Sequence, residues 1–368
     1  MMWLAGCGGS SGSSSGGEPV DPYGLTVAWG QVSQEVVVSW QDREGAEHYE
    51  LLLARDPLED PEHYASYEGG ELIMDAESPV TLQLAPGTWY FRVAAVADEV
   101  DFQISDEVSL FNPLGGLNDT GITFCVDDDN ADVECSDEQV SALPGQDGHS
   151  GRDADSSLIK LGAGAAGFDY TPICHSGDAA GEGDCPLDPL PGADDNDWAC
   201  TRDNVTGLVW ELKVDDPEHL RYSGHRYRWY SNDLPEHDGE IGHIGDNEDC
   251  VGLTHCNTQA YVRSVNETGL CGARDWRLPE ANELAGILNL NTIQPAIDDQ
   301  AFDATGATSW AGTPDFPLDT SNPYAWVTEF SGGAVATERT SSRFTVRLVR
   351  ADSAPTAGNP PIFSGAQK

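Results

Sequence analysis

Residues 271–290, CGARDWRLPEANELAGILNL, place a cysteine, two arginines, a tryptophan and two glutamates beside a short apolar stretch. Such side chains could form a catalytic centre, or they could hold a domain together. A serine or cysteine nucleophile with a recognisable base is not evident in the chain, and the metalloprotease motif H-E-x-x-H is absent. We therefore predict a protein that is not an enzyme and has no catalytic residues.

A basic and aromatic segment covers residues 221–230 in an otherwise acidic chain. Alternate members of this segment can belong to the core of a strand, whereas exposed members could stack on sugars or pair with sulfates or carboxylates. We expect residues 219–249 to form a long surface loop. The predicted ligand-binding residues are Arg226, Arg228, Trp229 and Tyr230.

An acidic cluster lies in the segment CVDDDNADVEC, between two cysteines. Calcium prefers several oxygen ligands at close range, and the candidate ligands are Asp127, Asp128, Asp129 and Asp132. An EF-hand frame starting at Asp128 fails because Val133 and Gln139 occupy its sixth and twelfth positions. Calcium therefore stays an alternative to a solvated acidic loop, and no other cofactor is expected.

Two other motifs predict no cofactor site. Four histidines lie near Cys250 and Cys256, namely His225, His237, His243 and His255. Zinc favours histidine and cysteine ligands, but the spacing of these residues fits no standard zinc-binding frame. Residues 162–167, GAGAAG, satisfy G-x-G-x-x-G, yet the following FDYTPIC does not resemble the helix that a dinucleotide site requires. We interpret this stretch as a glycine turn.

The composition excludes one class of partner. The chain has 368 residues, with 63 acidic and 18 basic side chains and a formal net charge of -45. This field repels a phosphate backbone, so we expect no nucleic-acid partner.

The chain contains nine cysteines, and eight of them lie between residues 125 and 271 in loop-rich sequence. An even set in such sequence predicts disulfides and an oxidising compartment. Cys125 with Cys135 and Cys174 with Cys185 are close pairs that would each close a short loop. The ninth cysteine is Cys7.

Residues 4–17, LAGCGGSSGSSSGG, resemble a bacterial lipobox followed by a flexible tether. The resemblance implies that Cys7 carries a lipid. Only MMW precedes the box, so we expect the true start, with its signal peptide, to lie upstream. The predicted location is the outer membrane, cell surface or periplasm, with membrane contact through the lipid alone.

We divide the chain into five parts, which are a start and tether (1–20), an all-β domain (21–112), a disulfide-stapled acidic segment (113–197), an α+β domain (198–352) and a tail (353–368). The all-β domain shows short alternating runs separated by turn residues, a pattern typical of a sandwich. Its segments VVVSW (36–40) and PGTW (86–89) resemble strands and a turn of the fibronectin type III family.

The α+β domain shows two amphipathic helical patterns, in 255–270 and 278–290, and strand patterns in 206–212 and 344–350. Four of its segments closely resemble the Lcl C-terminal domain family of bacteria. They are WACTRDNVTGLVWELK (198–213), GLCGARDWRLPEANEL (269–284), YAWVTEF (324–330) and VRLVR (346–350). The resemblance implies a C-type-lectin-like architecture and adhesion to sulfated glycans through a basic surface, although this chain is acidic.

In view of this resemblance, we expect residues 271–290 to have a structural role and to hold the domain together. We expect Arg274 and Arg277 to form ion pairs, Trp276 to pack, and Pro279 to lie in the first turn of a helix. The expected disulfides of the domain join Cys271 to Cys200 and Cys250 to Cys256.

The predicted function is a non-catalytic surface lipoprotein that recognises a glycan or extracellular protein in the manner of an adhesin. A structural calcium-binding envelope protein is the alternative. The segment RLPEANEL is also similar to formylglycine-generating enzymes, but these need late cysteines and none follows Cys271.

Overall fold

The computed structural model describes residues 23–30, 34–97, 103–127, 133–135, 143–234, 239–303, 307–315 and 323–352. Cys7, Asp128, Asp129, Asp132 and the tail therefore lie outside the described residues. In these ranges, no helix has the length and apolarity that crossing a membrane requires.

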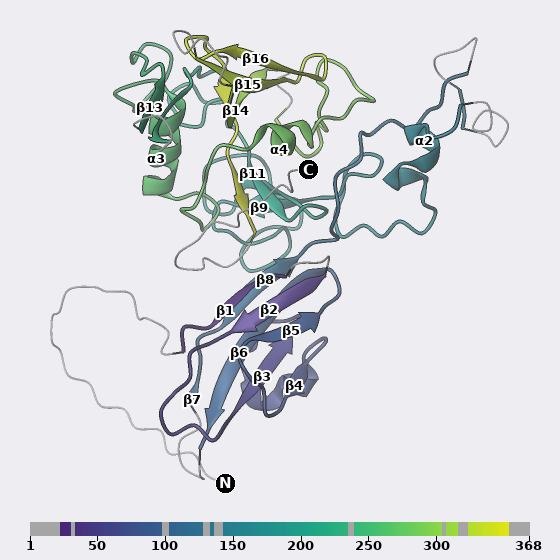
Figure 1. Ribbon diagram of the computed structural model, residues 1–368, viewed down its shortest axis with the longest axis vertical. Helices are drawn as coiled ribbons and strands as arrows, with labels where there is room; N and C mark the ends of the chain where they lie inside the picture. Colours follow the sequence, from purple (N-terminus) through teal and green to yellow (C-terminus); the bar gives the residue numbers. More distant parts are fainter. Residues whose placement is uncertain are drawn as a thin grey trace. The chain divides into compact units, whose positions relative to one another are not determined.

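The chain forms two compact units, each described here by itself (Figure 1). The first comprises Met1–Val27, Val38–Val80 and Tyr90–Val108. The second comprises Ala28–Val37, Thr81–Trp89 and Ser109–Lys368.

Two sheets account for the first eight strands. The larger one has the order β4 (Glu71–Ile73), β3 (His48–Ala54), β6 (Gly87–Val96) and β7 (Gln103–Ile104), and β8 (Val108–Asn112) also pairs with β6. The smaller one has the order β1 (Thr26–Trp29), β2 (Glu35–Ser39) and β5 (Val80–Gln83). Buried and partly exposed residues alternate along β2, as the pleat of a strand requires.

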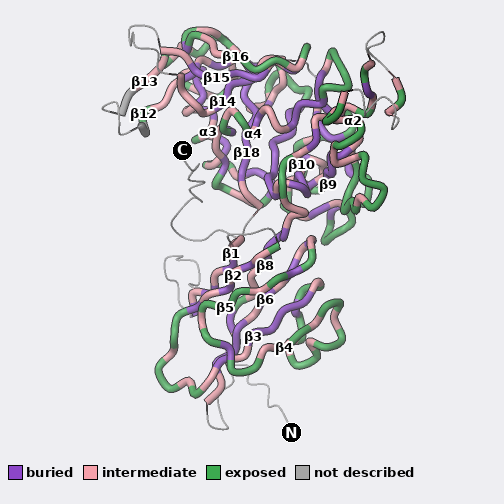
Figure 2. Tube along the Cα trace, turned by 45° about the vertical axis from the view of Figure 1, so that its right-hand side comes forward, coloured by how far each residue is buried: buried purple, intermediate pink, exposed green. Residues whose placement is uncertain are grey.

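The second half of strand β3, residues 51–54, is buried on both faces, whereas buried and partly exposed residues alternate in its first half (Figure 2). Leu51 and Leu53 lie opposite Val93 and Phe91 of β6, and all four are buried. Leu52 belongs to a separate cluster that also receives side chains from the 3-10 helix η1 (Pro61–Ser66). This double coverage explains why HYELLLA is a nearly continuous apolar run.

Residues 143–174 contain little regular structure before strand β9. They form the short helix α2 (Asp147–Ser150), the 3-10 helix η2 (Arg152–Ala154) and then β9 (Tyr170–Cys174). Ala163 and Tyr170 form a β-bridge around the glycine-rich stretch, and a strand follows it. GAGAAG is therefore a turn and does not open a helix.

Two further sheets organise residues 170–351. The first has the order β18 (Val349–Ala351), β11 (Leu208–Glu211), β10 (Trp198–Asp203) and β9. The second has the order β16 (Ala334–Arg339), β15 (Tyr324–Glu329), β14 (Thr308–Asp315) and β17 (Thr345–Val346), with β17 parallel to β14. The predicted single strand over 344–350 is wrong, because β17 and β18 join different sheets.

Helix α3 (Thr258–Thr268) confirms the first predicted helix. Its N-cap, Asn257, accepts a hydrogen bond from the Ala260 amide, as short polar side chains do at this position. Strands β12 (Tyr230–Leu234) and β13 (Gly239–Gly242) form a small hairpin.

The second predicted helix is much shorter than the pattern suggested. Helix α4 (Ala281–Ala285) has five residues, and Glu280 and Glu283 form a capping box at its start. Pro279 precedes the N-cap, so its expected place in the first helical turn is wrong.

A pocket beside a buried charge network

A fully buried carboxylate ends strand β11. Glu211 Oε1 accepts hydrogen bonds from Lys213 Nζ, at 2.8 Å, and from the Tyr261 hydroxyl, while Oε2 accepts from the Leu348 amide at 3.0 Å. Lys213 Nζ also donates to the Tyr261 hydroxyl at 2.8 Å. These donors offset the large cost of removing a carboxylate and an ammonium group from water.

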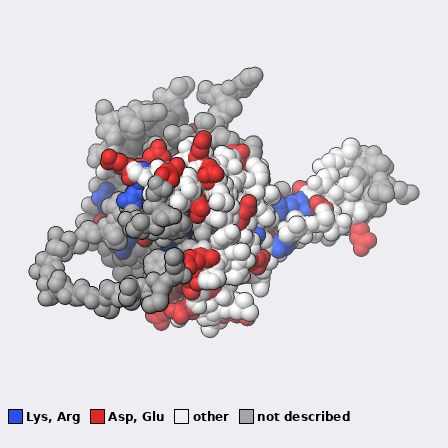
Figure 3. Space-filling view, turned by 90° about the horizontal axis from the view of Figure 1, so that it is seen from below, with Lys and Arg blue, Asp and Glu red and all other residues white. Residues whose placement is uncertain are grey.

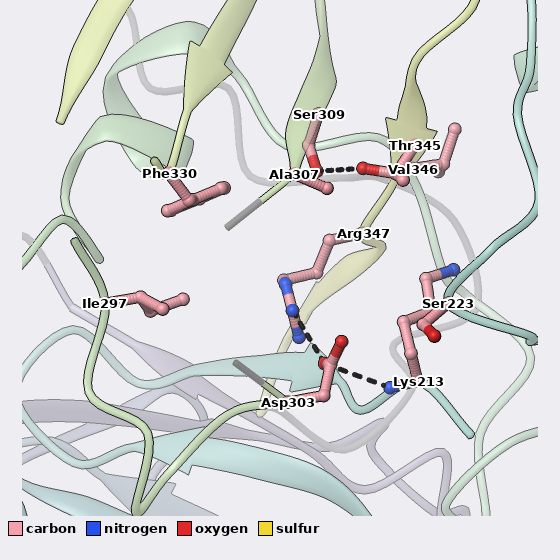
Figure 4. A pocket seen from close by; sticks show the side chains of 10 residues that line it. All are labelled: Lys213, Ser223, Ile297, Asp303, Ala307, Ser309, Phe330, Thr345, Val346 and Arg347. Atoms are coloured by element: carbon pink, nitrogen blue, oxygen red, sulfur yellow. Dashed lines mark hydrogen bonds and ion pairs between the residues drawn. The ribbon is translucent and has the colours of Figure 1, made fainter. Parts of the chain in front are cut away.

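Arg347, between β17 and β18, extends this network. Its Nη1 donates to the Glu211 carbonyl oxygen at 2.8 Å and its Nη2 to Asp303 Oδ1 at 2.7 Å. Asp303 Oδ1 also accepts from the Lys213 amide at 3.3 Å. Figure 4 shows Asp303 between Arg347 and Lys213, in contact with both.

Two atoms of this network have no hydrogen-bond partner among the described residues, namely Asp303 Oδ2 and Arg347 Nε. The cavity next to them measures about 10 Å³, and hydroxyl groups of Ser309 and Thr345 also line it. That volume is about the size of one water molecule.

Arg221 is a third buried cation in this region. Its Nη1 donates to the carbonyl oxygens of Leu212, at 2.7 Å, and Ala199, at 3.3 Å, and its Nη2 donates to Gly192 at 3.2 Å. The guanidinium therefore fastens the loop at Gly192 to the end of the β10–β11 hairpin.

A pocket of about 670 Å³ opens between this loop and the segment after β11. Residues 191–193 form one wall, and Val214, His219 and Ser223 line it from the segment after β11. Buried Lys213 and half-buried Asp303 also line the pocket, as do the exposed residues Asp215 and Asp216. The volume falls within the range of pockets for small ligands, which is roughly 300–1,000 Å³.

Burial lowers the pKa of two pocket residues. The pKa of the Lys213 ammonium is lowered by burial, and the charge of Glu211 opposes this change. The pKa of His219 is lowered by burial and by the charge of Arg221, so its ring is neutral at pH 7. Because His219 Nδ1 accepts a hydrogen bond from the Arg221 amide at 3.0 Å, Nε2 carries the proton.

The predicted ligand-binding residues do not form an exposed basic and aromatic surface. Trp229 is 1 % exposed and its Nε1 donates to the Ala311 carbonyl oxygen at 2.9 Å, so its predicted stacking on a ligand is wrong. Arg228 is half-buried, donates to the Ser341 carbonyl oxygen and lies 3.7 Å from Asp246. Arg226 and Tyr230 are half-buried as well.

The described residues contain no group of three or more histidine, cysteine, aspartate or glutamate side chains that could hold a metal ion. Of the predicted calcium ligands, only Asp127 is described, so the calcium prediction is untested. Cys250 and Cys256 form a disulfide and cannot bind zinc as thiolates. His255 Nδ1 instead faces the Gly245 carbonyl oxygen at 3.2 Å.

The side chains of the segment 271–290 hold neighbouring elements of the domain together. Trp276 is buried and its Nε1 donates to the Leu270 carbonyl oxygen at 3.0 Å. Arg277 forms a bidentate ion pair with Glu283, with both distances 2.7 Å, as expected. Arg274 instead donates to carbonyl oxygens at the end of α3, so its predicted ion pair is wrong.

Four disulfides are present, and they are the pairs that the sequence led us to expect. They are Cys125–Cys135, Cys174–Cys185, Cys200–Cys271 and Cys250–Cys256.

The sequence interpretation missed the buried charge network and the pocket beside it, although three charged residues of the network lie in quoted motifs. Glu211 and Lys213 end the segment VWELK, and Arg347 lies within VRLVR. The available signal was a charged residue inside an otherwise apolar strand pattern, which requires a buried partner.

Residues 170–351 thus form a mostly β, disulfide-linked region with an open polar pocket beside buried charges. Within it, residues 199–350 match the family model of the Lcl C-terminal domain, which confirms the resemblance of the sequence motifs. No curated protein and no solved structure matches the chain.

Proposed function

We propose that the protein is a non-catalytic recognition protein of the bacterial cell surface or envelope, anchored by a lipid on Cys7. Its Lcl-type region binds a glycan or an extracellular protein. The observation that carries this proposal is the pocket of about 670 Å³, which presents donors and acceptors from Lys213, His219, Ser223 and three carboxylates.

The state of the cysteines favours binding over catalysis of the formylglycine-generating type. All eight described cysteines are in disulfides. No cysteine follows Cys271 in the sequence. That chemistry needs free thiols late in the domain, and the described residues offer none.

We also propose the finer fold assignments. A fibronectin type III-like architecture for the first eight strands is supported by their arrangement in two sheets and by the contact of Trp40 with Tyr49, whose ring centroids lie 5.7 Å apart. A C-type-lectin-like architecture for the Lcl-type region is supported by its two small sheets, α3 and the Cys200–Cys271 disulfide.

A binding screen of the full chain against glycan and matrix-protein arrays, with calcium and with a chelator, tests the proposal. Ala193 lines the pocket and is exposed, so we expect Ala193→Trp to obstruct the pocket and abolish binding without unfolding the chain. Ala334→Trp, at an exposed residue of β16, is the matched control and should bind normally.

Equal binding by both variants would exclude the pocket as the site. No binding to either array, together with a melting temperature that falls when calcium is removed, would overturn recognition in favour of the structural calcium-binding alternative.

A further inference from the structure

We infer that the pocket binds a small zwitterion, a molecule with one carboxylate and one ammonium group, of the size of an amino acid or short peptide. The inference goes beyond the proposed function, because it assigns a ligand class to the same pocket from the charges around it and does not depend on recognition of a surface ligand. Three features carry it: the charge of the floor, an unused donor there, and the opposite charge of the rim.

The region beneath the pocket holds more positive than negative charge. The buried cations are Lys213, Arg221 and Arg347, whereas the carboxylates among them are Glu211 and Asp303. Arg221 donates its hydrogen bonds to carbonyl oxygens and makes none to Glu211 or Asp303. A buried cation without a counter-charge is costly, and a ligand carboxylate would offset that cost.

Lys213 has a donor to offer such a carboxylate. An ammonium group carries three N–H donors, and its two hydrogen bonds in the structure go to Glu211 and Tyr261. Lys213 lines the pocket, and so does Ser223, whose side chain carries a hydroxyl donor. A carboxylate reaching the floor would accept hydrogen bonds from both groups, and bonds between ionised partners are the strong ones.

The rim has the opposite charge. Asp215 and Asp216 are exposed and line the pocket, and His219 adds no positive charge at pH 7. Two carboxylates at the entrance disfavour polyanions such as sulfated glycans, and they attract an ammonium group. Because the floor favours a carboxylate and the rim favours a cation, a ligand with both charges complements the pocket.

Titration calorimetry of the full chain tests this inference with trialanine, N-acetyl-trialanine and trialanine amide at low ionic strength. The second peptide lacks the ammonium group and the third lacks the carboxylate. We expect trialanine to bind, and each blocked peptide to bind at least about tenfold more weakly. Glycine, which has both charges close together, shows whether their separation matters.

The double variant Asp215→Asn/Asp216→Asn removes the rim charge at exposed positions, so we expect it to fold normally. It should bind trialanine about tenfold more weakly and N-acetyl-trialanine no more weakly than the unaltered protein. Glu218→Gln, at an exposed neighbour that does not line the pocket, is the matched control and should leave all three affinities unchanged.

Equal affinities for the three peptides, or no binding by any of them, would overturn the inference. If array ligands still bind and Ala193→Trp still abolishes that binding, the proposed function survives and only the zwitterion fails. If trialanine binds as expected and no array ligand binds, the inference of a zwitterion site is supported and the proposed recognition of a glycan or extracellular protein is wrong.

Discussion

Asp203 shows how one buried carboxylate can be held by a turn. It is 1 % exposed at the end of β10, and its Oδ1 accepts hydrogen bonds from the amides of Val205, at 3.0 Å, and Thr206, at 3.3 Å. Its Oδ2 accepts from Asn118 Nδ2 at 2.5 Å. Burial raises the pKa of Asp203 from 3.8 to about 6, although these hydrogen bonds oppose the rise.

Replacement of this carboxyl, Asp203→Asn, should change how stability depends on pH. A raised pKa means that the folded state gains stability from the proton below pH 3.8 and loses it as the pH rises through about 6. Between pH 4 and 7 the unaltered protein should therefore lose about 2 kcal/mol relative to the variant. Denaturant unfolding of both proteins across this range measures the difference.

The variant can keep the turn, because its side-chain oxygen still accepts from the two amides. Asp215→Asn, at an exposed position, is the control and should show no such trend. A stability difference between Asp203→Asn and the unaltered protein that stays constant with pH would contradict the prediction.

At the residue scale, the sequence identified the charged and aromatic residues of the domain, but it did not show which of them are buried. Trp229 and Arg228 are neighbours in one motif, yet the first lies in the core and the second pairs with Asp246 near the surface. Only a known strand register separates such alternate residues. Asp303 is far from Lys213 in sequence, so no local pattern could place both beside one pocket.

At the element scale, the end of α3 depends on a side chain from outside the helix. Arg274 donates to the carbonyl oxygens of Asn266, Glu267 and Thr268, and the last carbonyls of a helix otherwise lack intrahelical donors. The positive guanidinium is also favourable at the negative end of the helix dipole.

We expect Arg274→Ala to destabilise the protein by about 1 kcal/mol, since it removes these hydrogen bonds and the charge at the helix end. Thermal unfolding followed by circular dichroism measures the change. Arg263→Ala, at an exposed position within the same helix, removes an equal charge and should cost clearly less. Equal costs would show that Arg274 does not cap the helix.

Helices and strands whose apolar residues recur with a clear period could be predicted from the sequence, whereas short elements could not. Helix α3 has its N-cap and apolar stripe within one segment, so local signals define it. Helix α4 ends after five residues, whereas the apolar pattern continues through Leu288, because Ile287 and Leu288 are buried outside the helix. Apolar spacing reports burial and does not by itself report helical geometry.

At the scale of the whole molecule, the disulfides close loops of very different length. Cys200 and Cys271 are 71 residues apart, whereas Cys250 and Cys256 are 6 apart. A crosslink that closes a longer loop removes more entropy from the unfolded chain. The first bridge also lies in the main apolar cluster, beside buried side chains of β10 and α3.

Replacing Cys200 and Cys271 by alanine together should therefore lower the free energy of unfolding by about 4 kcal/mol, and replacing Cys250 and Cys256 by about 2 kcal/mol. Denaturant unfolding followed by tryptophan fluorescence compares the two double variants. Similar losses, or a larger loss for the short loop, would contradict this ranking.

The charge of the whole chain was available from composition, and Figure 3 shows acidic side chains spread over the face in view. The sandwich-like alternation and the family motifs also indicated the main regions. The segment before β9 was expected to be irregular and to hold the Cys125–Cys135 disulfide, but its short helices α2 and η2 were not predicted, because no period in the sequence marks them.

The last two strands also affect the order in which the chain can fold during synthesis. β17 pairs with β14, and β18 pairs with β11, which precedes it by more than a hundred residues. The β14 sheet therefore lacks β17 until residue 346 has left the ribosome, and the β11 sheet lacks β18 until residue 351 has left it. Arg347 is synthesised equally late, so the Glu211 carbonyl oxygen and Asp303 gain their hydrogen bonds to its guanidinium only after the rest of the network has been made.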